Sequence, residues 1–136
     1  MLQRRFLGYR AGERDMTIPV YSSARSFRVW MYAVGHSILL LRSLKSIHFP
    51  TRIDVLFVSV DAMCVSMNLA GIHICQRDSA PLPAGLSAVG EGYKLFTLGD
   101  GLQAPWVVGG NVAWHEDEGN DTDPSHFRLP RMVISQ

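Results

Sequence analysis

The sequence predicts an all-β protein: a single compact antiparallel β-sandwich or small barrel of about six to eight strands, with little helix. Short runs of β-branched, aromatic and aliphatic residues recur between residues 26 and 114, as is typical of strands. Clusters containing Gly, Pro and Asn separate these runs and predict turns. With 136 residues, the chain is long enough for one domain with a substantial core.

The first two runs, FRVWMYAV at residues 27–34 and ILLLRSLK at residues 38–45, predict a β-hairpin. The turn signal Gly35-His36-Ser37 lies between them. A helix is the alternative, because apolar residues in this stretch also recur at the helical spacing of about 3.6 residues. The interruption at the midpoint and the β-rich first half favour the hairpin.

The next strand, Ile53–Val60, reads IDVLFVSV and is apolar on both alternating faces. Pro50 marks a loop at residues 46–51 before it. A strand that is apolar on both faces is buried on both sides, so we expect this one to be central in the sheet.

A second hairpin is predicted from Met63–Met67 and Ile72–Gln76, with its turn at residues 68–71. In this register Cys64 lies opposite Cys75. The period of two then separates an apolar face from a second face, which carries Cys64, Ser66, His73 and Cys75.

The remaining elements follow from the same signals. An irregular stretch at residues 77–92 precedes a strand at 93–98, a turn at Gly99-Asp100-Gly101 and a strand at 106–114. Gly109-Gly110 inside that last strand predicts a bulge or a bend. An acidic loop follows at residues 115–126, and Met132–Ile134 predicts a short edge strand.

Charge divides the chain into two segments. Residues 1–52 carry nine Lys and Arg against two Asp and Glu, a net of +7, whereas residues 53–136 carry four against ten, a net of −6. We expect these segments to lie against each other and neutralise; no basic run interleaved with aromatics indicates nucleic acid binding. Residues 1–17 are interpreted as a disordered N-terminal extension, with Met16 as an alternative start, and residues 18–136 as the β domain.

No stretch has the length and apolar character of a membrane span, and two cysteines without an export signal favour free thiols in a reducing cytoplasm. Cys64, His73 and Cys75 are nevertheless candidate metal ligands, with a disulfide or ordinary packing as alternatives. A small hydrolase or transferase would use His36 or His73 with a nearby Ser or Cys, for which Cys64 is a candidate nucleophile. Leu39 stands where a Gly-x-Ser-x-Gly elbow requires glycine. The sequence indicates no cofactor.

The leading hypothesis is a non-enzymatic binding or protein-interaction module, including self-association through an exposed sheet edge. Four aromatic residues are candidate ligand contacts, although strand aromatics commonly belong to the core: Trp30, Tyr32, Trp106 and Trp114. A further alternative is an immunity-type partner of a toxin or another basic protein. Its contact would be the carboxylates of the acidic loop, which are also candidates for weak cation binding: Glu116, Asp117, Glu118, Asp121 and Asp123.

The runs VWMYAVGHSILLLRS (residues 29–43), TRIDVLFVSVDAM (residues 51–63) and LAGIHI (residues 69–74) carry a resemblance to known proteins. They resemble a group of small uncharacterised bacterial proteins with a W-x-Y-x-V-x-H-x-x-L-L-x-R-S stretch, an I-D-V-x-F strand and an L-x-G-I-x-I strand. The resemblance covers about residues 27–115. It implies a compact β fold from a bacterial cytoplasm and brings no activity with it.

Overall fold

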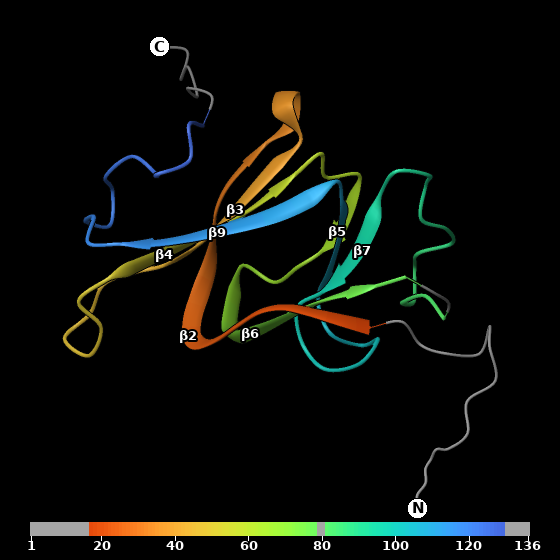
Figure 1. Ribbon diagram of the computed structural model, residues 1–136, viewed down its shortest axis with the longest axis horizontal. Coiled ribbons are helices and arrows are strands. Elements are labelled where there is room, and N and C mark those ends of the chain that lie inside the picture. The colour runs from red at the N-terminus through yellow and green to blue at the C-terminus, as the bar shows by residue number, and fades with distance from the viewer. Residues whose placement is uncertain (1–16, 79–80, 130–136) are drawn as a thin grey trace, which may run out of the picture.

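The computed structural model describes residues 17–78 and 81–129. Within these residues it contains one antiparallel sheet of eight strands, which confirms the predicted all-β class (Figure 1). Residues 1–16 of the predicted extension and the predicted strand Met132–Ile134 lie outside the described residues.

The strand order across the sheet is β5-β8-β7-β6-β2-β3-β4-β9. The strands are β2 (Thr17–Ala33), β3 (Ile38–Ser43), β4 (Arg52–Val58), β5 (Ala62–Cys64), β6 (Asn68–Arg77), β7 (Lys94–Thr97), β8 (Trp106–Gly109) and β9 (Asn111–Asp117). A single short 3-10 helix, η1 (Val34–His36), completes the regular structure of the described residues.

The long strand β2 joins the two halves of the sheet. Residues 17–28 of β2 pair with β6, and residues 28–33 pair with β3. The register shifts between Ser23 and Ser26 and again between Val29 and Met31. Such bulges bend a strand and increase its twist, and Figure 1 shows β2 as a strongly curved ribbon.

A single residue, Gly110, joins β8, the second strand in the sheet order, to β9, the last strand at the opposite end. β8 pairs with β5 and β7, whereas β9 pairs with β4 at the opposite end. The Gly110 amide donates to the Val58 carbonyl over 2.9 Å. The sheet therefore coils back on itself, and the bend predicted at Gly109-Gly110 is confirmed.

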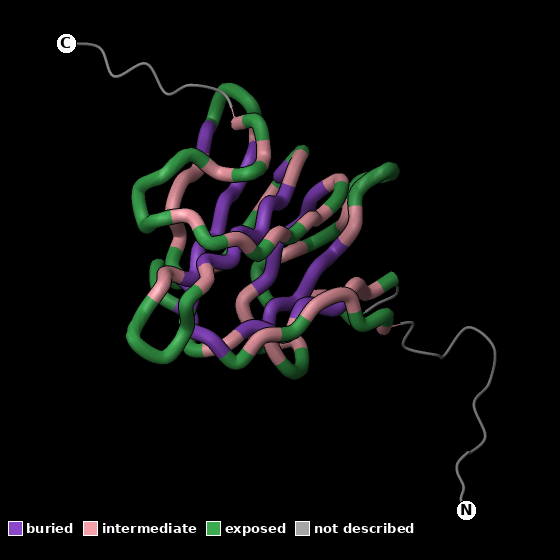
Figure 2. The backbone as a smooth tube through the Cα atoms, turned by 60° about the vertical axis from the view of Figure 1, so that its left-hand side comes forward, coloured by how far each residue is buried: buried purple, intermediate pink, exposed green. Residues whose placement is uncertain are grey.

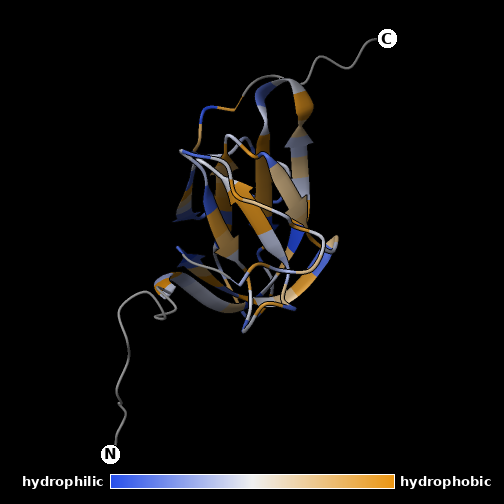
Figure 3. Ribbon diagram, turned by 90° about the vertical axis from the view of Figure 1, so that its right-hand side faces the viewer, coloured by the Kyte–Doolittle hydropathy of each residue, from blue (hydrophilic) through white to orange (hydrophobic). Residues whose placement is uncertain are grey.

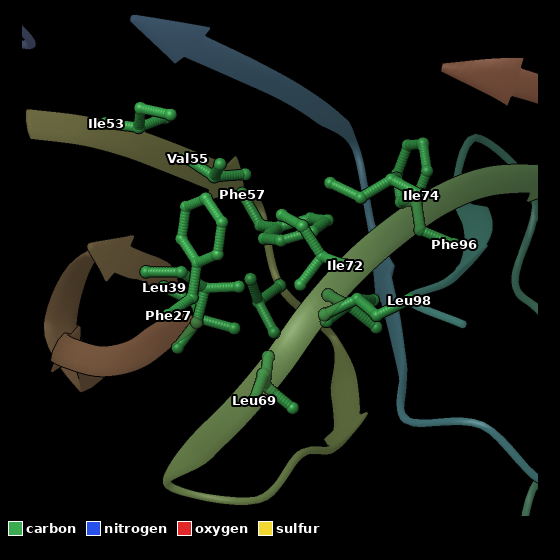
Figure 4. Packing of buried hydrophobic residues seen from close by; sticks show 13 residues of the cluster. Phe27, Leu39, Ile53, Val55, Phe57, Leu69, Ile72, Ile74, Phe96 and Leu98 are labelled. Atoms are coloured by element: carbon green, nitrogen blue, oxygen red, sulfur yellow. The ribbon is translucent and has the colours of Figure 1, made fainter. Parts of the chain in front are cut away.

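The core fills the interior of the coiled sheet. Side chains from β2, β3, β4 and β6 point toward one another there (Figure 4), and the largest buried cluster includes Phe27, Leu39, Leu41, Ile53, Val55, Phe57, Ile72, Ile74 and Phe96. Burial follows the strands while the connections stay exposed (Figure 2), and the hydrophobic residues concentrate on the same strands (Figure 3).

The first predicted hairpin is confirmed. β2 and β3 pair from Ala33–Ile38 outward, and Ser37 closes the turn with a φ of 53°. β4 is buried on both faces as expected and pairs with both β3 and β9. Its predicted central position is wrong, because only β9 separates it from the end of the sheet.

The second predicted hairpin is wrong. β5 pairs with β8, so that Cys64 lies opposite Trp106, while Cys75 lies opposite Thr97 on one side and Pro19 on the other. Residues 68–71 belong to β6 rather than to a turn. Gly71, with a φ of 91°, lies between two register pairs where the β2–β6 ladder shifts, so its positive φ serves a bulge.

Candidate functional site

A basic groove of about 530 Å³ is the candidate site. Segments of β2, of β3 with the loop after it, and of β6 line the groove: Arg25, Ser26, Phe27, Arg28, Arg42, Ser43, Leu44, Lys45, Ser46, Phe49, Asn68, Leu69 and Ala70. Four of these residues are cations and none is a carboxylate. Its volume lies in the range of small-ligand sites.

A row of polar residues crosses the sheet and contributes Asn68, Arg28 and Arg42 to the groove lining. The register pairs Asn68 with Arg28, Arg28 with Arg42, Arg42 with Asp54, and Asp54 with His115. Directly opposed residues lie on the same face of a sheet, so these five side chains form a row across five strands. Two cations stand side by side in this row, and a single carboxylate lies beyond them.

The carboxylate neutralises only one of the two cations. Arg42 Nε and Nη2 donate to the two oxygens of Asp54 over 2.6 and 2.9 Å, in a bidentate ion pair. Both side chains are only 2% exposed. The Trp30 ring lies 4.9 Å from the Arg42 guanidinium carbon. The Asp54 carboxylate is therefore paired with Arg42 and does not neutralise Arg28.

The segment after β9, residues 118–129, covers the Asp54 end of the row, and we call it the strap. Arg42 Nη1 donates to the Asp121 carbonyl over 2.7 Å, and the Ser125 hydroxyl donates to Asp54 over 2.6 Å. The His126 ring stacks on His115 with a centroid separation of 3.6 Å. Phe127 and Leu129 pack against the apolar residues around Leu40 and Leu56.

A second buried arginine, Arg52, also holds the strap. Its guanidinium forms a bidentate pair with Asp117 and donates to the carbonyls of Asn120, Asp123 and Pro124. The hydrogen bonds from Arg52 hold the pKa of the Asp117 carboxyl below its usual value. The ion pairs of Arg25, Arg42 and Arg52 all join the basic segment to the acidic one, as expected for these three cations.

Arg25 forms the inner wall of the groove. It is 8% exposed and donates to Ser43, Thr51 and the Leu44 carbonyl. Its guanidinium carbon lies 4.5 Å from the centre of the Phe49 ring. This cation is therefore bound to the fold, as is Lys45, whose ammonium donates to the Glu118 carbonyl over 2.7 Å.

Arg28 differs from the other cations of the groove. It is exposed, and within the described residues the structure gives its guanidinium no hydrogen-bond or ion-pair partner. Its neighbours across the ladder are Arg42, already paired, and the exposed amide Asn68. The groove therefore presents one uncompensated guanidinium.

Exposed apolar side chains stand beside the groove. The loop between β3 and β4 closes with two hydrogen bonds between the backbones of Ser46 and Phe49. Ile47 at its tip is 96% exposed and Phe49 is 43% exposed. Met67, directly before Asn68, is 64% exposed, and its carbonyl accepts from the Val29 amide.

The four candidate aromatic residues do not converge on one pocket. Trp106 is 8% exposed in a cluster with Leu95 and Val108, and Tyr32 packs on the interior core. Trp30 lies on the other face, beside Arg42, in the cluster under the strap. Trp114 is 44% exposed, and its ring lies tilted against that of Tyr21 with a centroid separation of 4.9 Å.

The acidic candidates are largely engaged within the fold. Asp117 pairs with Arg52, Glu116 accepts from Thr51, and the Asp123 carboxylate accepts from the Asn120 amide. Among the described residues, the structure gives no partner to the carboxylates of Glu118 and Asp121, whose backbone carbonyls bind Lys45 and Arg42. The loop predicted at residues 115–126 is wrong at its start, because residues 115–117 belong to β9. The rest of the predicted solvated loop holds the buried arginines through its backbone carbonyls.

The candidate catalytic residues are only partly brought together. His36 is exposed in the β2–β3 turn. His73 lies opposite Ser22 in the β2–β6 ladder; its Nδ1 is hydrogen-bonded to the Ser22 hydroxyl, and its Nε2 lies 3.2 Å from Cys75 Sγ. Burial raises the pKa of the Cys75 thiol, which disfavours a thiolate nucleophile. None of the residues Ser22, His73 and Cys75 lines the groove.

The predicted metal ligands do not form a cluster. Two strands, β8 and β7, separate Cys64 in β5 from β6, which carries His73 and Cys75. Both cysteines are free, Cys64 exposed and Cys75 buried. No group of three or more His, Cys, Asp or Glu suited to a metal ion occurs among the described residues.

Sequence reasoning missed Arg28, Arg42 and Asp54 as site residues. The signal was present, because Arg42 and Asp54 are isolated charges inside otherwise apolar runs. Charged residues in such positions are rarely buried unless they are paired.

Comparison with protein-family models, curated proteins and solved structures finds no match. The helical content of the described residues includes no segment with the length and apolar character needed to cross a membrane.

Proposed function

We propose that this protein is a non-enzymatic protein-interaction module whose contact surface is the β3–β4 loop together with the rim of the basic groove. The observation that carries this proposal is the exposure of Ile47, at 96%, on a hydrogen-bonded turn beside the groove. An ordered turn holds this large aliphatic side chain in water, so its burial by a partner contributes favourably to the free energy of binding.

The surface has the composition of an interaction site. Phe49 on the groove lining and Met67, directly before the lining residue Asn68, extend the exposed apolar area, and four cations line the same groove. Apolar anchors next to charged groups are characteristic of protein interfaces, in which the former supply affinity and the latter orientation. A second copy of the chain is the alternative occupant of the same surface.

An enzymatic function is less well supported. The Ser22–His73 pair has a nucleophile and a base in contact, but catalysis also requires a concave site for a substrate. The cations and the exposed apolar residues gather instead around the groove.

Affinity capture with the Ile47→Ser variant tests the proposal. Val34→Ser is the matched control, since Val34 is 77% exposed in the β2–β3 turn and does not line the groove. We expect a partner that binds the wild type and Val34→Ser to bind Ile47→Ser at least about tenfold more weakly. Light scattering on the same proteins identifies self-association. Equal binding by both variants would refute this contact surface.

A further inference from the structure

We propose that the open end of the polar row binds an oxyanion of the partner, a carboxylate or a phosphate, with the Arg28 guanidinium as its principal ligand. This inference rests on the proposed function, because it names the chemical group that the partner presents to the groove.

Charge along the row supports an anion at this position. Arg28 and Arg42 are directly opposite each other in the ladder, and opposed like charges destabilise a sheet. Asp54 relieves only Arg42, to which it is bound through both oxygens. An anion on Arg28 would supply the counterion that the row lacks.

Donor chemistry points to the same ligand class. A guanidinium presents its N–H groups in a planar fork that matches carboxylate and phosphate oxygens. The side chains of Asn68, opposite Arg28, and of Ser26 and Ser46 on the groove lining add further polar groups. The lining contains no carboxylate that would repel an anion.

The strap explains why the site lies at this end of the row. It covers Asp54 and His115 through Ser125 and His126. The groove lining includes Arg28, Asn68 and Arg42, and it includes no residue of the strap. With a volume of about 530 Å³, the groove also has space for residues flanking the anionic group.

Nuclear magnetic resonance titration of the full chain tests the proposal, with inorganic phosphate and acetate as separate probes. The Arg28 Nε–H signal should shift saturably with at least one of these anions. Arg28→Gln should weaken binding by about tenfold or more, because it removes charge-assisted hydrogen bonds. Arg128→Gln is the matched control: Arg128 is exposed on the strap and does not line the groove, so its loss should leave binding unchanged.

Equal weakening in both variants would show general charge attraction and overturn the proposal, as would the absence of any saturable shift with either anion. Saturation by phosphate alone identifies a phosphorylated group, and saturation by acetate identifies a carboxylate. The outcome separates this inference from the proposed function. Partner binding that depends on Ile47 but not on Arg28 refutes the anion site alone, whereas anion binding without an Ile47-dependent partner refutes the interaction surface alone.

Discussion

The polar row contains two neighbouring arginines in opposite situations, Arg42 toward its covered end and Arg28 toward its open end. Arg42 is 2% exposed, bound to Asp54 and covered by the strap, whereas Arg28 on the neighbouring strand is exposed and unpaired among the described residues. The difference arises from the next strand along, because β4 supplies a carboxylate opposite Arg42 and β6 supplies an amide opposite Arg28. The arginine with a carboxylate partner is buried, whereas the arginine without one is exposed and accessible to a ligand.

The largest expected effect comes from breaking the covered end. Asp54→Asn leaves the buried Arg42 charge uncompensated and weakens the acceptor for Ser125. We expect a loss of about 3–5 kcal/mol in the free energy of unfolding, measured by urea denaturation.

Two further variants identify the cause of that loss. Asp61→Asn removes an exposed carboxylate and should change stability by less than about 0.5 kcal/mol. The double variant Arg42→Met with Asp54→Leu should recover much of the loss, because it removes both buried charges together. If the double variant were as unstable as Asp54→Asn, the uncompensated charge would not be the cause.

A smaller effect is expected at Asp117, the second clamp of the strap. Because hydrogen bonds from Arg52 lower the native pKa, the carboxylate adds stability that is complete above its ordinary pKa of 3.8. That contribution is lost as the pH falls through this value toward the lower native pKa. Asp117→Asn should cost about 1–2 kcal/mol at neutral pH and reduce the decline of stability in acid.

Urea denaturation at a series of pH values between pH 3 and pH 7 measures this effect. Glu118→Gln is the matched control, since the structure gives the adjacent carboxylate no partner. An acid-dependent slope that is identical in the wild type and in Asp117→Asn would contradict the clamp.

The smallest effect is expected at the open end. Arg28→Gln should change the free energy of unfolding by less than about 0.5 kcal/mol, or stabilise the fold slightly by relieving the repulsion with Arg42. A loss above about 1 kcal/mol would show that Arg28 has a structural partner, and the contrast between the two ends would disappear.

Local signals in the sequence predict most of the strands but not all their partners. The first hairpin is predicted from the turn signal Gly35-His36-Ser37, because a tight turn pairs two strands that are neighbours in the sequence. Gly71 carries an equally good turn signal, yet it serves a bulge against β2. A positive φ suits both structures, and only the distant partner strand decides between them.

The same limit applies to the site. The opposite charges of the two segments predict that they neutralise each other, and the structure shows this for Arg25, Arg42 and Arg52. The identity of the uncompensated residue depends on which strand lies beside β2, and alternation within one strand carries no information about that neighbour. Arg28 can therefore be identified as the uncompensated cation only from the registers of the strand pairs in the structure.

The long stretch of sequence between β4 and its partner strand β9 has a consequence for synthesis. β4 leaves the ribosome well before β9, its partner in the native ladder, and at typical rates of about 5–20 residues per second the delay lasts seconds. During that time a strongly apolar strand has one unpaired edge, which is a template for aggregation. Arg52 and Asp54 interrupt its apolar sequence. We expect these charges to protect the nascent chain before β9 and the strap arrive to cover them.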